Sequence, residues 1–153
     1  KLNEREQTEF RLRTLGYVFQ DYALVPDLSA QENIMVPLLM GGMDWDVAKN
    51  TANGSLDAVG LKGKYDNLPA QLSGGEQQRL SFARSFLQRP DWLFLDEATA
   101  SLDPEAEEAM YASLKRALPG LTMVSIAHRP AVARFHDRIL RVEDSRLIEI
   151  GPH

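Results

Sequence analysis

Short apolar runs alternate along this chain with longer stretches that have helical periodicity. The runs at residues 15–19 and 121–126 favour strands, and the run at 92–95 predicts a strand buried on both faces. Helices are predicted at residues 3–13, 29–40, 44–59, 75–87 and 104–118, and an antiparallel hairpin at 138–142 and 146–150. This alternation of strands and helices predicts the α/β fold class.

Several of the expected helices begin with residues that suit a helix N-terminus. Ser29 with Glu32 and Ser73 with Glu76 have the three-residue spacing of a capping box. Asp103 can cap the helix that follows it, with a proline at the first helical position. The helix at 75–87 should pack against the sheet through Leu80, Ala83 and Leu87, with Phe82 and Phe86 close by. A glycine at position 54 predicts a weakened helix there.

The stretch LSGGEQQR at residues 72–79 is the first candidate for chemistry. Ser73 can act as the N-cap, and Glu76 completes its capping box. Gly74 and Gly75 carry no side chains, so their N–H groups can approach a ligand closely. An unobstructed helix start attracts anions, phosphate among them. An ordinary capped helix would show the same pattern.

Two adjacent acids, Asp96 and Glu97, follow the apolar run at 92–95. Open α/β sheets place their ligands at the carboxyl ends of the strands. Because side chains alternate along a strand, the two carboxylates can do different work. One can hold Mg²⁺, directly or through water, while the other orients an attacking water. A solvated strand end would also explain the pair.

These stretches resemble a known family. Residues 72–79 resemble the signature motif of ATP-binding cassette (ABC) ATPases, and residues 93–97 resemble their Walker B motif with its catalytic glutamate. Three shorter stretches add to the resemblance: YVFQ ending at Gln20 is similar to the Q-loop, residues 101–103 to the D-loop, and SIAHR at 125–129 to the H-loop. Taken alone, Gln20 or His128 would be explained by ordinary structural roles.

The resemblance implies ATP and Mg²⁺ as ligands and a head-to-tail pair of cassettes. In such a pair Asp96 and Gln20 would serve Mg²⁺, Glu97 would polarise the attacking water, and Gln20 and His128 would position it. Ser73, Gly74, Gly75 and Glu76 would bind the nucleotide of the opposite subunit, and Ser101 and Asp103 would cross the dimer interface. Capping alone would also account for Asp103.

The implied fold is part of a P-loop NTPase sheet with a helical subdomain inserted at roughly residues 27–87, the whole of residues 1–153 forming an ABC ATPase fragment. A P-loop, G-x-x-x-x-G-K-[ST], is missing: the only Gly-Lys pair, Gly63-Lys64, is followed by Tyr65, and Ala58 takes the earlier glycine position. We expect that the P-loop precedes residue 1 in a longer parent protein and is missing from this chain by truncation. Without it, the fragment would be inactive alone.

Composition and charge exclude several other classes of function. The formal net charge of −5 argues against a broad basic nucleic-acid-binding face, and the absence of cysteine excludes disulfides and cysteine zinc sites. No apolar run approaches the roughly 20 residues that span a bilayer. We expect a cytoplasmic protein, peripheral on the inner face of the membrane, that pairs with a second ABC ATPase domain and a transmembrane permease.

Other functions remain open from the sequence. The chain can be a non-catalytic piece that donates its signature motif to a complete cassette, or a soluble ABC ATPase of ribosomes or DNA repair. Residues 10–40 resemble ATPases of lipoprotein-release or macrolide-export systems, whereas residues 88–143 resemble exporters of the peptide or very-long-chain acyl type. The sequence therefore leaves the transported substrate and its direction undecided.

Overall fold

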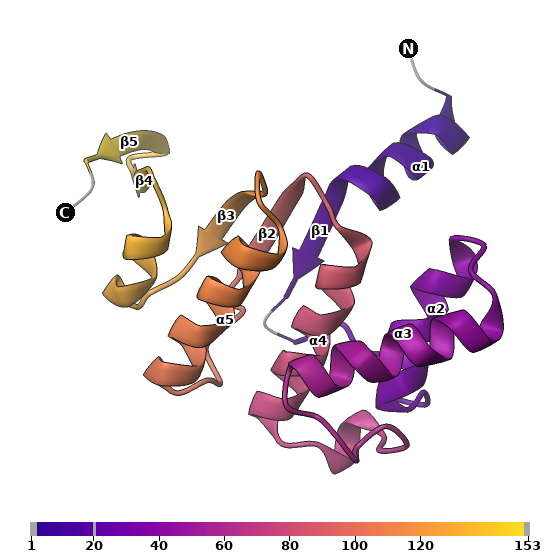
Figure 1. The fold of residues 1–153 in the computed structure, drawn as a ribbon. Coiled ribbons are helices and arrows are strands. Elements are labelled where there is room, and N and C mark those ends of the chain that lie inside the picture. Colours follow the sequence, from indigo (N-terminus) through magenta and orange to yellow (C-terminus); the bar gives the residue numbers. More distant parts are fainter. Residues whose placement is uncertain (1–2, 20, 152–153) are drawn as a thin grey trace.

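The computed structural model describes residues 3–19 and 21–151, apart from the side chains of residues 12 and 13. A parallel sheet contains β1 (Leu15–Val18), β2 (Trp92–Asp96) and β3 (Thr122–Ile126), in the order β1-β2-β3. In register, Gly16 of β1 lies opposite Leu93 of β2, and Leu93 lies opposite Met123 of β3. The predicted α/β class is confirmed, because parallel strands are joined here by helical crossovers (Figure 1).

Two helices, α4 (Gly74–Gln88) and α5 (Pro104–Ala117), cover one face of this sheet (Figure 1). Their apolar side chains and those of the strands form one buried cluster, which includes Val18, Phe82, Leu93, Leu95, Tyr111 and Leu114. The alternation of side chains along β2 sends Leu93 and Leu95 into this cluster.

A second cluster joins α4 to α2 (Ala30–Met40) and α3 (Trp45–Ala58). The prediction that Leu80, Ala83 and Leu87 face the sheet is wrong, because all three pack in this second cluster. In α4, Phe82 and Phe86 pack in the cluster that covers the sheet. The reason is that α4 lies between the sheet on one side and helices α2 and α3 on the other, so two faces of this helix are apolar.

Helices α2, α4 and α5 begin at their predicted caps, whereas Asp44 stands at the start of α3 with no capping hydrogen bond from its side chain. Ser29 caps α2 and Ser73 caps α4, each in a capping box with the glutamate three residues on. The Asp103 carboxylate accepts a hydrogen bond of 2.8 Å from the backbone N–H of Ala106 at the start of α5. Helix α1 (Glu4–Thr14) is capped by Asn3. Helix α3 continues through Gly54, and the predicted weakening of the helix there stays a prediction.

The prediction that β2 is buried on both faces is wrong. Trp92 is 44% exposed, and its ring, with those of Phe94 and Tyr17, forms a stacked row on the sheet face opposite α4 and α5. Val124 and Ile126 of β3 are exposed as well. An apolar run cannot tell whether both faces of a strand are covered, because that depends on which elements pack on the sheet.

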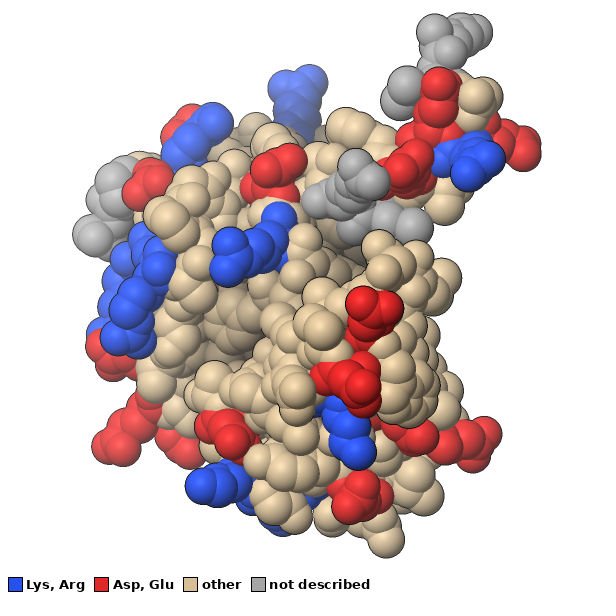
Figure 2. Space-filling view, turned by 45° about the vertical axis from the view of Figure 1, so that its right-hand side comes forward, with Lys and Arg blue, Asp and Glu red and all other residues tan. Residues whose placement is uncertain are grey.

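The chain ends in the predicted hairpin, β4 (Ile139–Glu143) paired antiparallel with β5 (Arg146–Ile150). Short 3₁₀ helices, η1 (Pro69–Gln71) and η2 (Pro130–Phe135), precede α4 and the hairpin. On the face shown in Figure 2, uncharged side chains fill the hollowed middle, and charged ones lie mainly around it. None of the described helices has the length and apolarity needed to cross a bilayer.

Candidate functional site

The carboxyl ends of β2 and β3 bring two of the predicted catalytic residues together. The backbone N–H of Glu97 donates to the carbonyl of Ile126 at 2.9 Å, which fixes the two strand ends side by side. The Glu97 carboxylate lies 3.0 Å from His128, between Oε1 and Nε2. Parallel strands meet at one edge with their carboxyl ends, so this pair stands where such sheets bind ligands.

Glu97 has a left-handed backbone, with φ of +47°. A non-glycine residue in this region costs roughly 1–3 kcal/mol and persists only where surrounding contacts fix it. Here its N–H is bonded to Ile126, and its carbonyl accepts from the backbone N–H of Ala100 at 3.0 Å. Strain of this kind gathers at functional sites, and in this chain it lies on the carboxylate that contacts His128.

The predicted signature tip and D-loop also lie together. A Cβ placed on Gly74 would be 3.6 Å from the Ser101 hydroxyl, and one on Gly75 would be 3.6 Å from the Ser101 carbonyl. The Tyr22 and Ser101 hydroxyls are hydrogen-bonded at 2.6 Å. Sequence reasoning missed Tyr22, whose only signal was its position two residues after Gln20.

Glu76 is engaged within its own chain. Its carboxylate accepts from the backbone N–H of Ser73 at 2.9 Å and pairs with the Lys64 ammonium at 2.8 Å. The hydrogen bond from Lys64, and then that from Ser73, hold the pKa of the Glu76 carboxyl below its ordinary value. Capping therefore accounts for Glu76, and its predicted contact with a nucleotide stays a prediction.

Of the two predicted Mg²⁺ ligands, the structure describes one. Asp96 is exposed at the end of β2, and Gln20 lies outside the described residues. In the part of the chain that the structure describes, no group of three or more histidine, cysteine, aspartate or glutamate side chains could hold a metal. A single exposed carboxylate nevertheless suits Mg²⁺, which keeps several waters and takes one or two protein carboxylates.

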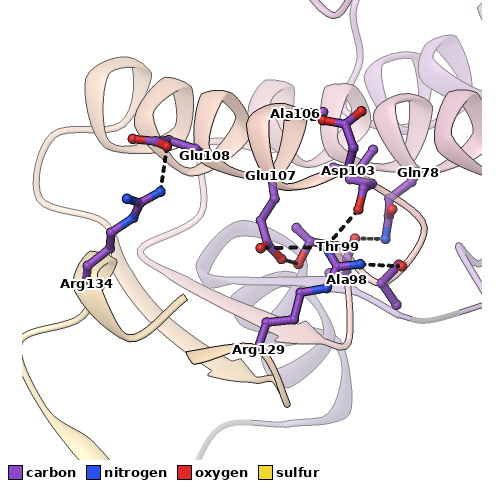
Figure 3. A network of polar contacts seen from close by, with 11 residues as sticks. Gln78, Ala98, Thr99, Asp103, Ala106, Glu107, Glu108, Arg129 and Arg134 are labelled. Carbon is purple, nitrogen blue, oxygen red and sulfur yellow. Dashed lines mark hydrogen bonds and ion pairs between the residues drawn. The ribbon is translucent and has the colours of Figure 1, made fainter. Parts of the chain in front are cut away.

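A buried polar network connects the turn after Glu97 to α5 (Figure 3). Glu107 is only 2% exposed and accepts a hydrogen bond from the Thr99 hydroxyl. The Arg129 guanidinium donates to the carbonyls of Leu102 and Ala100 at 2.7 and 3.1 Å. Glu107, in the first turn of α5, was not among the candidate site residues of the sequence analysis.

A sequence signal for this network existed. Glu107 lies three, four and seven residues before Met110, Tyr111 and Leu114, so it belongs to the apolar face of α5. A charged side chain on such a face is stable only when it is paired or hydrogen-bonded.

A family model described as "ABC transporter" matches residues 1–100, and the chain belongs to that family as an ATP-binding domain. Two relatives are ATP-binding proteins. The chain is 38% identical over 149 residues to lipoprotein-releasing system ATP-binding protein LolD 2 of Caulobacter vibrioides, covering 96% of this chain and 65% of the relative. It is 39% identical over 151 residues to the uncharacterized ABC transporter ATP-binding protein YbbA of Escherichia coli, covering 97% and 66%.

The fold agrees with a solved cassette. The dimeric structure of a post-hydrolysis state of the ATP-binding cassette MJ0796, bound to ADP and Pi, matches with a TM-score of 0.88 and 33% identity. That likeness covers 100% of this chain and 69% of the other. The chain thus spans just under two thirds of the length of the curated relatives described above. The predicted family and fold class are confirmed.

Proposed function

We propose that this chain carries the hydrolytic and signature parts of an ABC transporter ATPase, which hydrolyses Mg-ATP between two cassettes to drive transport across a membrane. One observation carries the proposal: a strained Glu97 in contact with His128 at the carboxyl edge of a parallel sheet. Membership of the family and the dimeric, ADP-bound state of MJ0796 support it.

In the proposed reaction the Glu97 carboxylate accepts a proton from water while the water oxygen attacks the γ-phosphorus, and the bond from that phosphorus to the β,γ-bridging oxygen breaks, so that ADP leaves. His128 would orient that carboxylate through the 3.0 Å contact, and its exposed ring would contact the γ-phosphate. Asp96, with Gln20, would hold Mg²⁺, and the metal would neutralise charge on the phosphate oxygens. Preorganised groups of this kind contribute most of the stabilisation in phosphoryl transfer.

The tip of α4 is proposed to serve a nucleotide held by a second cassette. Ser73, Gly74 and Gly75 start this helix, and their N–H groups lie at its positive dipole end. Ser101 stands beside both glycines, so the two segments would meet the partner cassette as one surface. The boundary of the helical subdomain, roughly residues 27–87, remains part of this proposal.

The transmembrane permease is the second proposed partner, on the inner face of the membrane. A groove of about 420 Å³ lies between β1 and α2, lined among others by Val25, Val36 and Met40. Met40 is 77% exposed, while Ile34 and Met35 of the same helix are buried in the core. Core packing therefore accounts for one side of α2, and the exposed side of the helix supports docking of a permease segment.

Glu97→Gln in the full-length gene product tests the proposal. The change keeps shape and hydrogen bonding but removes the general base, so ATP turnover should fall by about 10²-fold or more. With Mg-ATP present, light scattering should detect accumulated dimers. Glu108→Gln, an exposed change on α5, should leave turnover and dimerisation as in the wild type. Unchanged turnover in Glu97→Gln would instead show that Glu97 is not the general base.

A further inference from the structure

We propose that Arg129 is a positioning residue that fixes the turn after Glu97 and so holds the Glu97–His128 pair in register. The proposal rests on the hydrolytic function above and adds to it a residue that acts through the turn after Glu97. Its basis is the network in Figure 3, where the Arg129 side chain reaches from the end of β3 to the turn that follows β2.

The guanidinium of Arg129 binds the turn at two points. Nη1 donates to the Leu102 carbonyl at 2.7 Å, and Nη2 donates to the Ala100 carbonyl at 3.1 Å. A guanidinium is planar and presents its donors in a fixed fork, so two carbonyls held at once fix both distance and orientation. Ser101, which lies between these two residues, is placed beside Gly74 and Gly75 by the same contact.

Arg129 is itself held by a buried carboxylate. Glu107 Oε2 lies 3.7 Å from Arg129 Nη1, and the Thr99 hydroxyl donates to Glu107 Oε1. A buried carboxylate strongly favours having partners for both oxygens. Because Thr99 belongs to the same turn, Glu107 binds that turn once directly and once through Arg129. On the far side of the turn, the Gln78 side-chain amide of α4 donates to the Ala98 carbonyl.

The position of Arg129 in the chain explains its effect on the reacting pair. It follows His128 directly, and the turn that it binds begins at Glu97. The side chain therefore connects the two backbone segments whose side chains meet at 3.0 Å. A shift of about 1 Å in the relative position of catalytic groups can lower a rate by about 10²-fold.

The first test compares Arg129→Lys and Arg129→Ala with Arg134→Ala in the full-length gene product. Arg134 pairs with exposed Glu108, one residue along α5 from Glu107, and does not touch the turn, so it is a matched control (Figure 3). We expect Arg129→Ala to lower kcat for ATP by about 10²-fold, with KM little changed. Arg129→Lys keeps the charge but loses the fork, so it should restore only part of kcat. Arg134→Ala should match the wild type.

The second readout does not depend on activity. The amides of Ala100 and Leu102 donate within the turn, to Glu97 and Thr99, and are protected while the turn is fixed. Arg129→Ala should speed their hydrogen exchange, and Glu107→Gln should do so to a smaller extent because the Thr99 hydroxyl keeps its acceptor. Exchange in α3, far along the chain, should stay as in the wild type.

The outcomes separate this inference from the proposed function. Wild-type kcat and wild-type exchange in Arg129→Ala would overturn the inference, as would a loss of activity that merely follows the fraction of unfolded protein. If the wild-type gene product hydrolyses no ATP, the proposed function fails. Exchange in the turn then still decides whether Arg129 fixes it.

Discussion

Gly75→Ala should separate the stability of the α4 tip from its function. Gly75 lies in the first turn of α4 with helical backbone geometry, so an alanine meets no conformational obstacle there. Its added Cβ would lie 3.6 Å from the Ser101 carbonyl and 3.8 Å from Leu102 Cδ2. These are ordinary van der Waals contacts, and nothing in the chain must move to accept the methyl group.

The magnitude follows from helix propensity and from the geometry of phosphate binding. Alanine is favoured over glycine in helices by up to about 1 kcal/mol, and each 1 kcal/mol raises Tm by roughly 2–4 °C in a protein of this size. A nucleotide approaching the tip would meet the new methyl group before its oxygens reached hydrogen-bond distance from the backbone N–H. Loss of one such preorganised donor costs about 10²–10³ in kcat.

The assay is a pair of measurements on the full-length gene product: Tm by calorimetry and ATP turnover at saturating Mg-ATP. Gly54→Ala is the matched control, because Gly54 lies inside α3 and an added Cβ there has no neighbour within 4 Å. It should raise stability by about 1 kcal/mol and leave turnover unchanged. For Gly75→Ala we expect the same or higher Tm together with a large loss of turnover.

Two results would refute the reasoning. Full turnover in Gly75→Ala would mean that no ligand approaches this tip closely. A clear loss of stability would mean that the space beside Ser101 is tighter than the contact distances indicate.

Two further predictions concern stability. Gly16→Ala should lower the free energy of unfolding, measured in urea, by about 1–3 kcal/mol. The reason is that the added Cβ would lie 2.9 Å from side-chain atoms of both Leu93 and Pro90, which are buried. A loss below about 0.5 kcal/mol would mean that the neighbouring side chains move to accept the methyl group. Folding lowers the pKa of the Glu76 carboxyl. The ionised carboxylate therefore stabilises the folded protein above the unfolded pKa, near 4.3, and this stabilisation is lost as pH falls through the folded pKa. Glu76→Gln should therefore flatten the decline of Tm below about pH 5; parallel Tm curves for variant and wild type would contradict this.

The helix starts were readable from the sequence because their contacts are local. In both predicted capping boxes the partners are three residues apart, as with Ser73 and Glu76. Such a hydrogen bond forms wherever the local backbone turns into a helix, whatever packs on that helix later. The start of α5 at Asp103 was predictable for the same reason.

The meeting of Glu97 and His128 was also within reach of the sequence, although these residues are distant along the chain. Each lies two residues after the end of a predicted strand, and neighbouring parallel strands end at the same edge of a sheet. The contact of 3.0 Å and the left-handed backbone of Glu97 came from the structure alone.

By itself, then, the sequence determined the elements, their caps and the motifs of an ABC ATP-binding domain. Only the tertiary structure decided which faces those elements bury and how they meet. Arg129 reaches Leu102 and Glu107 because β3, α5 and the turn after β2 converge in space. Neither spacing nor periodicity encodes that convergence. It depends on how α4 packs both on the sheet and on α2 and α3. That packing is set by the shapes of all their side chains together.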